Sequence, residues 1–268
     1  MRRRGYAGSA RARFARWIEE YCHPDMIQRA VELPLRRDMV TLLQYVRENK
    51  IVGTQSTGNL PLKAVRAVTQ QFVNPPELDQ WIGDRVYRLR SEADVWSLYF
   101  LHILAEVAGL VATAPGRRWR VTAYGESFLS MDPLLQVSFL LTVWWYRVNW
   151  LVAYPFEGMG ESLPRGFQQA VLARLRGLPV GERIEFEEFA NGLIRETGLT
   201  WRAQTDSVQM LLHGSIQQMV IHILANFGVL EREYQEVPLG RGTISRLVAF
   251  AVTPFGEALL EAVGVVAG

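Results

Sequence analysis

The stretch LHILA at residues 101–105 recurs as IHILA at residues 221–225. Each copy is followed by a glycine, Gly109 in the first and Gly228 in the second. The offset between the matching letters is 120 residues. Such self-similarity indicates an internal repeat, which decides the fold before any local propensity does.

A second pair of blocks supports the repeat. VTAYGE at residues 121–126 recurs as VTPFGE at residues 252–257, at an offset of 131 residues. The second copy therefore contains 11 additional residues between the two blocks. Additional length is tolerated best in surface connections, so we expect the insertion in a hairpin or loop.

The first copy is expected to hold helices, one short strand, a hairpin and a closing helix, because apolar spacings change and turn residues separate the segments. The predicted elements are a helix at 35–48, a strand at 50–52, a helix at 61–72, a helix at 94–109 capped by Asp94, a hairpin turning at Pro115-Gly116, and a closing helix capped by Thr122.

The second copy repeats this order with a longer hairpin. The predicted elements are a helix at 167–176, a strand at 183–184, a helix at 186–196, a helix at 206–226, a hairpin whose turn contains Pro238, Gly240 and Gly242, and a closing helix that begins at Thr253-Pro254.

Helix, strand, helix, helix and hairpin is the element order of the winged helix-turn-helix superfamily, which the chain resembles over residues 33–131 and 165–263. The resemblance implies a mainly α (α+β) fold with two winged helix-turn-helix repeats joined by a long aromatic-rich helix. The predicted divisions are a basic amphipathic arm and helix at 1–30, repeat 1 at 31–131, the connecting helix at 132–160 and repeat 2 at 161–268. Members of this superfamily bind DNA, bind RNA or dock proteins, so the fold does not select the function.

The connecting helix is expected to begin at Asp132-Pro133 and to reach about Val152. A polar stripe along it argues against a membrane span. Its aromatic residues are interpreted as a core between the repeats, and a platform for stacking bases is the alternative. These residues are Trp144, Trp145, Trp150, Tyr154 and Phe156.

Composition predicts a folded cytoplasmic protein. Hydrophobic residues make up 49% of the chain, and its single cysteine excludes an internal disulfide. The formal net charge of +2 is too small to indicate nucleic-acid binding. Only Lys50 and Lys63 are lysines, and all other basic residues are arginines.

The N-terminal stretch predicts a basic amphipathic helix, since apolar residues recur at helical spacing among arginines. Three roles are open for it: an arm that grips phosphates, a surface for anionic lipid, or a helix that packs on the first repeat. Its residues are Arg2, Arg3, Arg4, Arg11, Arg13 and Arg16 with Phe14, Trp17, Ile18 and Tyr21.

No pattern of an active site is found, so we expect no catalysis, cofactor or metal. The GTQSTG stretch at residues 53–58 lacks the lysine of a phosphate-binding loop. The four histidines do not have metal-ligand spacing. His102 and His222 match in the repeat and are interpreted as structural histidines.

The first hairpin contains the best candidate binding site. Its cationic residues are suited to phosphates, and basic residues of the preceding helix and the N-terminal arm extend the site. The candidates are Arg117, Arg118, Trp119, Arg120, Lys63, Arg66, Arg3 and Arg4, with Arg85, Arg88 and Arg90 as a possible extension. The alternative is that the hairpin arginines pair with Glu92, Asp94 and Glu126.

The third helices argue against standard docking in a major groove. The first opens with carboxylates and aromatic residues, whereas the second offers Gln209, His213, Gln217 and Gln218 for base edges. We therefore predict a non-catalytic nucleic-acid-binding protein, such as a transcriptional regulator of DNA. The alternative is a protein-interaction module that docks a partner subunit, and oligomerisation is compatible with either.

Overall fold

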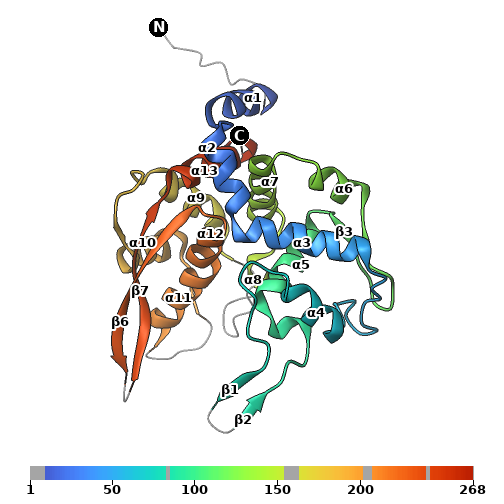
Figure 1. The fold of residues 1–268 in the computed structure, drawn as a ribbon. Helices are drawn as coiled ribbons and strands as arrows, with labels where there is room; N and C mark the ends of the chain where they lie inside the picture. The colour runs from blue at the N-terminus through green and yellow to red at the C-terminus, as the bar shows by residue number, and fades with distance from the viewer. Residues whose placement is uncertain (1–9, 83–84, 154–162, 202–206, 240–241, 268) are drawn as a thin grey trace. The chain divides into compact units, whose positions relative to one another are not determined.

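The computed structural model of the chain describes residues 10–82, 85–153, 163–201, 207–239 and 242–267. These residues are mainly helical, with small antiparallel sheets (Figure 1). They divide into two compact units. Unit 1 comprises residues 1–26 and 150–268, and unit 2 comprises residues 27–149.

This division differs from the predicted boundaries at 30, 131 and 160. The N-terminal helix belongs to the unit that contains the second repeat, and the first part of the expected connecting helix belongs to unit 2 with the first repeat. Unit 1 is therefore built from two separate stretches of the chain.

Unit 2 contains the helices and hairpins of the first repeat. Its elements are α2 (Pro24–Glu32, which begins in the last residues of unit 1), α3 (Pro34–Glu48), α4 (Leu62–Thr69), β1 (Gln80–Ile82), β2 (Arg85–Tyr87), the 3₁₀ turn η1 (Glu92–Asp94), α5 (Trp96–Val107), β3 (Val111–Ala112), β4 (Arg120–Val121), α6 (Ala123–Leu129) and α7 (Pro133–Tyr146). The β1–β2 hairpin was not predicted. Asp94 does not cap α5 as expected, because its side chain closes a capping box with Ser91 at η1.

Unit 1 contains the second repeat and the N-terminal helix. Its elements are α1 (Ala10–Tyr21), α8 (Trp150–Ala153), α9 (Phe167–Arg176), β5 (Ile184–Glu185), α10 (Phe186–Thr197), α11 (Val208–Ile216), the π-helix η2 (Gln217–His222), α12 (Ile223–Asn226), β6 (Leu230–Leu239), β7 (Gly242–Val252) and α13 (Pro254–Ala267). The predicted helix at 206–226 is thus interrupted by a π-helical segment.

Both units close their hairpins onto the third helix in the same way. The hydroxyl of Thr122 donates to the carbonyl of Gly109 at 2.6 Å, and that of Thr253 donates to Gly228 at 2.7 Å. Each threonine also caps the following helix by accepting the N–H three residues on. The two glycines have φ of +71° and +73°, a conformation that favours glycine. The predicted caps and glycine stops are therefore confirmed.

The hydrogen bonds at the end of the third helix define how the repeats align. The N–H of Leu110 donates to Ala105 and that of Val229 donates to Leu224, both at 2.8 Å. This alignment has an offset of 119 residues, one fewer than the matching letters suggest. The hairpin insertion is consequently 12 residues rather than 11.

The shift corrects the equivalence of His102 and His222. In the structural alignment His102 corresponds to Ile221, and both residues are buried. His222 corresponds to Ile103, and both are half-buried. The shared letters HILA are therefore one residue out of structural register.

Each unit pairs a short strand with the second strand of its hairpin. In unit 1 the sheet order is β5-β7-β6, and Ile184 of β5 lies opposite Phe250. In unit 2 β3 pairs with β4, and Val52 forms a bridge with Arg118 in the segment that precedes β4. The predicted strand at residues 50–52 is reduced to this bridge.

The expected long connecting helix is two helices. α7 ends at Tyr146 and α8 begins at Trp150, so the prediction of one helix to about residue 152 was wrong. Trp144 and Trp145 are fully buried. Tyr154 and Phe156 lie outside the described residues. None of the helices in the described ranges combines the length and apolarity that a bilayer crossing requires.

The N-terminal helix α1 packs on α13, at the other end of the chain (Figure 1). Trp17 is 3% exposed and donates its indole N–H to the carbonyl of Ala258 at 2.7 Å. Arg13 donates to the carbonyl of Val265. The expectation that this helix packs on the first repeat is therefore corrected.

Candidate nucleic-acid interface

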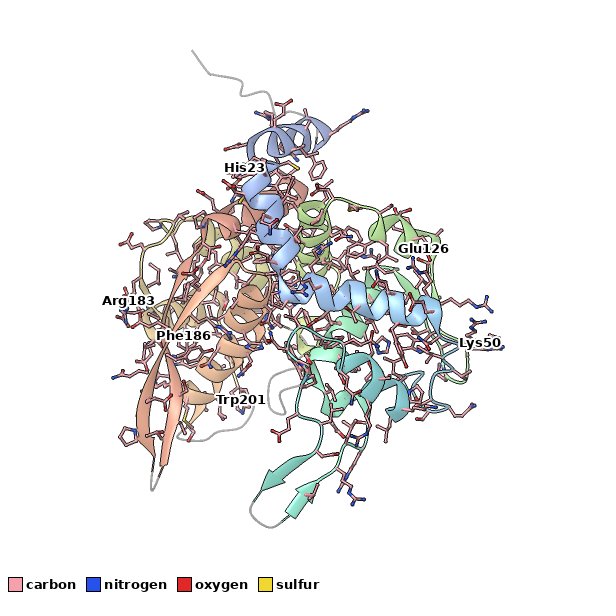
Figure 2. All side chains as sticks on the ribbon, in the orientation of Figure 1. His23, Lys50, Glu126, Arg183, Phe186 and Trp201 are labelled. Carbon is pink, nitrogen blue, oxygen red and sulfur yellow. The ribbon has the colours of Figure 1, made fainter. Side chains whose placement is uncertain are left out.

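Strand pairing in unit 2 gathers cations on one exposed face. Val52 bridges Arg118 in antiparallel sense, and the N–H of Trp119 donates to the carbonyl of Ile51 at 3.0 Å, so the segment that begins at Lys50 runs beside the one that carries the arginines. Cross-strand partners share a face, and Lys50, Arg118 and Arg120 are all exposed. These three residues are called the basic face. Lys50 is seen at the surface in Figure 2.

The hairpin arginines have no side-chain partner among the described residues. Arg117, Arg118 and Arg120 form neither a hydrogen bond nor an ion pair with them through their guanidinium groups. Arginine presents five N–H donors, so these groups are available to an external anion.

The carboxylates expected to neutralise these arginines are engaged elsewhere. Glu126 lies 3.5 Å from the guanidinium of Arg47. Asp94 accepts the backbone N–H groups of residues 90 and 91 at 2.8 and 2.9 Å, and the first of these bonds is the largest cause that lowers its pKa. The third candidate, Glu92, is buried.

Trp119 is not part of the exposed surface. Its side chain is almost fully buried, and its indole N–H donates to the carbonyl of Gly58 at 2.8 Å. Its ring lies 4.5 Å, centroid to centroid, from that of His102. The prediction that Trp119 contacts nucleic acid is therefore wrong, because its ring packs beneath the strand that carries the arginines.

A buried polar network supports Trp119 from below. Glu92 accepts the N–H of Leu60 at 2.5 Å, and its other oxygen lies 2.6 Å from Nδ1 of His102. His102 is buried as predicted, and its Nε2 has no hydrogen-bond partner in the described part of the chain. Glu106 Oε2 is 3.7 Å from this nitrogen. The network ties the start of α5 to the loop that holds the Trp119 indole.

The other predicted site residues are separated by the structure. Lys63 is exposed on α4 and has no side-chain partner among the described residues. Arg66 forms two hydrogen bonds with Asp79, at 3.0 and 3.2 Å, so its guanidinium is not free for phosphate. Arg3 and Arg4 lie outside the described residues, and no side-chain position is described for Arg85.

Charged side chains of the unit 1 sheet pair with one another and with neighbouring residues. Arg183 bonds to Glu233 at 2.6 Å and also to Glu185. Arg246 is paired with Glu187. The exposed side of this sheet is therefore occupied by alternating charges rather than by free cations.

Arg232, on the first strand of this hairpin, also has a partner. Arg232 donates to Nδ1 of His222 at 2.9 Å. Burial and the neighbouring Arg232 lower the pKa of His222 to about 4, so this imidazole is neutral at pH 7.

The third helices offer little to base edges. Gln209 and His213, predicted as candidates in the second copy, both bond to the side-chain oxygen of Asn191, at 3.2 and 2.9 Å. Gln217 and Gln218 are half-buried in the π-helix. In unit 2 half of the α5 residues are buried, and Glu106 is the one that is exposed.

Lys50 was missed by sequence reasoning although a signal for it existed. The predicted strand at 50–52 and the hairpin strand at 118–121 are neighbours in a winged helix-turn-helix order, and pairing them would have placed Lys50 beside the arginines. Within the described ranges no three His, Cys, Asp or Glu side chains gather as metal ligands would.

Comparison with known proteins gives no relative: no protein-family model, curated protein or solved structure matches the chain significantly.

Proposed function

We propose that the chain is a non-catalytic nucleic-acid-binding protein with two winged helix-turn-helix repeats, and that its basic face contacts phosphates of a DNA duplex. The observation that carries the proposal is the absence of any side-chain partner for Arg117, Arg118 and Arg120 among the described residues. A transcriptional role is the use of such binding that we favour.

The fold supports this proposal through the shared order of elements. In each unit a helix, a strand segment, a second helix, a third helix, a hairpin and a closing helix follow one another. The matching threonine and glycine bonds at the hairpin support an origin of both units from one ancestral unit.

The charge arrangement supports an anionic ligand. Lys50, Arg118 and Arg120 are exposed cations on two adjacent segments of the chain, and like charges that lie close together repel one another. A bound anion would reduce that repulsion. Arg118 and Arg120 project from the same face about 7 Å apart along the strand, a separation that suits neighbouring phosphates of one nucleic-acid strand.

The proposal uses the sheet face rather than a helix in the major groove. Half of the α5 residues are buried and the one exposed residue is the acidic Glu106, and the basic face has no exposed aromatic ring because Trp119 is covered. Single-strand binding relies on such rings. Contact with the backbone of a duplex fits the available side chains better.

A salt titration tests this function directly. Binding to a labelled duplex should weaken with a log–log slope of about −0.9 for each phosphate contacted. The triple variant Arg117→Ala, Arg118→Ala and Arg120→Ala should lower affinity more than tenfold and make the slope shallower by up to about 3. The matched control is Arg183→Ala with Arg246→Ala, where the arginines are already paired, and it should bind within twofold of the unmodified chain.

Two results would refute the proposal. One is no duplex binding even at about 50 mM salt, and the other is unchanged affinity in the triple variant. Binding of a protein partner that is insensitive to both salt and these substitutions would favour the docking-module alternative instead.

A further inference from the structure

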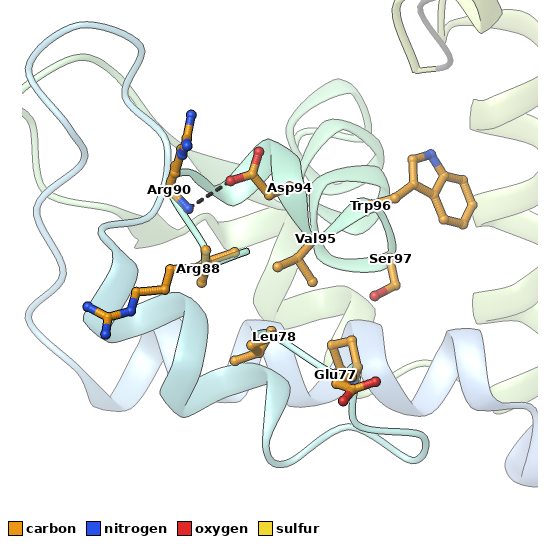
Figure 3. A pocket seen from close by; sticks show the side chains of 10 residues that line it. Glu77, Leu78, Arg88, Arg90, Asp94, Val95, Trp96 and Ser97 are labelled. Carbon is orange, nitrogen blue, oxygen red and sulfur yellow. Dashed lines mark hydrogen bonds between the residues drawn. The ribbon is translucent and has the colours of Figure 1, made fainter. Parts of the chain in front are cut away.

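Unit 2 contains an open cavity of about 580 Å³ beside the start of α5 (Figure 3). Its volume is within the range of small-molecule sites. Leu78 and Val95 face each other across it in Figure 3, and Leu89 adds to the apolar lining. Leu89 and Val95 are buried, so the floor of the cavity is apolar and belongs to the core.

The wall of this cavity is held by two aspartates. Asp79 accepts the N–H of Leu89 at 3.3 Å while bound to Arg66, and the bond from Arg66 lowers its pKa. Asp94 accepts the N–H groups of residues 90 and 91. Both carboxylates are thus engaged in holding segment 88–91, and the cavity is formed before any ligand binds.

The other charged side chains of the cavity lie on its rim, and the acidic one is separated from the basic ones. In Figure 3 the side chains of Arg88 and Arg90 point apart, and Arg88 extends from the end opposite Glu77. Neither guanidinium group forms a hydrogen bond or ion pair with described residues. Glu77 lies toward the other end near Ser97, and its carboxylate is likewise unpaired within the described part of the chain. Leu78 and Val95 lie between these ends.

We propose that this cavity binds a small zwitterion with an apolar body, of the class of a short apolar peptide with free ends. Its carboxylate is taken by Arg88, because a guanidinium group matches a carboxylate with paired N–H donors. Its ammonium is taken by Glu77, and its side chains cover Leu78, Leu89 and Val95. This site is separate from the basic face and does not depend on the proposed nucleic-acid binding.

Three ligands separate the contributions of the two ends: the dipeptide leucyl-leucine, its N-acetyl form and its C-terminal amide. Calorimetry on the full chain should show that the free dipeptide binds at least tenfold more tightly than either blocked form. Amide resonances of Val95 and Ser97 should shift on titration, which places the ligand in this cavity.

Matched variants test the assignment of each end. Arg88→Gln should abolish the preference for the free dipeptide over the amide, and Glu77→Gln should abolish the preference over the N-acetyl form. Arg117→Gln, an exposed arginine outside the cavity, should leave both preferences unchanged. Because all three side chains are exposed, circular dichroism should show unaltered folding.

The proposal is overturned if leucyl-leucine does not bind at millimolar concentration, if both blocked forms bind as tightly as it does, or if the shifted resonances lie only outside the cavity. Loss of duplex binding in the triple arginine variant would not affect this outcome, so the two proposals fail independently.

Discussion

The β3–β4 hairpin of unit 2, which carries Arg118 and Arg120 of the basic face, and the long hairpin of unit 1 have similar buried sides and different exposed sides. Trp119 and Phe250 occupy matching positions in the second strand of each hairpin, and both are buried. On the exposed side Arg118 and Arg120 have no side-chain partner among the described residues, whereas Arg183 is bonded to Glu233. The buried side is what the fold requires, and the exposed side is free to differ in function.

The largest expected effect tests the shared buried side. Trp119→Ala and Phe250→Ala should each lower the free energy of unfolding of their own unit by about 3 to 5 kcal/mol. Each ring is almost completely covered, and Phe250 also meets Phe189 edge-on at 5.1 Å. Urea denaturation measures the change.

The control for this pair of variants is Val52→Ala, because Val52 is 51% exposed and bridges Arg118 next to Trp119. Its effect should stay within about 0.5 kcal/mol. If the free energy of unfolding fell by less than about 1 kcal/mol in either aromatic variant, the two hairpins would not share a stabilising buried aromatic residue.

A moderate effect should appear as a pH dependence of the stability of unit 1. His222 has a folded pKa of about 4, below the usual value of 6.5, so the unfolded chain takes up the proton first as the pH falls. The free energy of unfolding should therefore decrease from about pH 6.5 to pH 4. One proton gives at most about 1.4 kcal/mol per pH unit, and the partial exposure of the ring makes the slope smaller.

The variant His222→Gln should flatten this slope, as measured by denaturation at several pH values. The matching residue in unit 2 is Ile103, which does not titrate. The exposed His23 serves as control, and His23→Gln should leave the slope unchanged. An equal slope in His222→Gln would assign the pH dependence to other groups.

The smallest effect concerns the exposed charges themselves. Arg120→Gln should raise the stability of unit 2 at low salt by about 0.2 to 1 kcal/mol, because it removes one cation of the basic face. Arg183→Gln should lower the stability of unit 1, because it removes the cation that is bonded to two carboxylates. Melting temperatures at low and high salt measure both, and salt should reduce both changes. If both substitutions changed stability in the same direction, the proposed difference between the exposed sides of the two hairpins would be contradicted.

Much of the element order could be predicted because local signals specified it. Thr122 and Thr253 carry the expected caps, and the helices end at Gly109 and Gly228 as expected. The β1–β2 hairpin was missed because strands of three residues leave almost no periodic pattern in the sequence.

Register was harder to predict than order. Four matching letters, HILA, suggested an offset of 120 residues, but the hydrogen bonds and burial follow 119. In an apolar helix a shift of one residue still places apolar side chains on most core positions, so letter identity could not decide between the two offsets.

The candidate site was predicted only in part. Alternation along the hairpin correctly separated Trp119 from Arg118 and Arg120, yet the same alternation should have excluded Trp119 from an exposed site. Arg66 is not available for phosphate because it is bonded to Asp79, and this pairing depends on side-chain geometry that no spacing in the sequence reveals.

The packing of α1 on α13 has a consequence for synthesis. Trp17 leaves the ribosome 241 residues before its acceptor Ala258. Unit 2 is one continuous stretch and can fold while translation proceeds, since domains generally fold as units. Until α13 has emerged, the indole of Trp17 lacks this acceptor, so the nascent chain exposes α1 to chaperones while the intervening residues are synthesised.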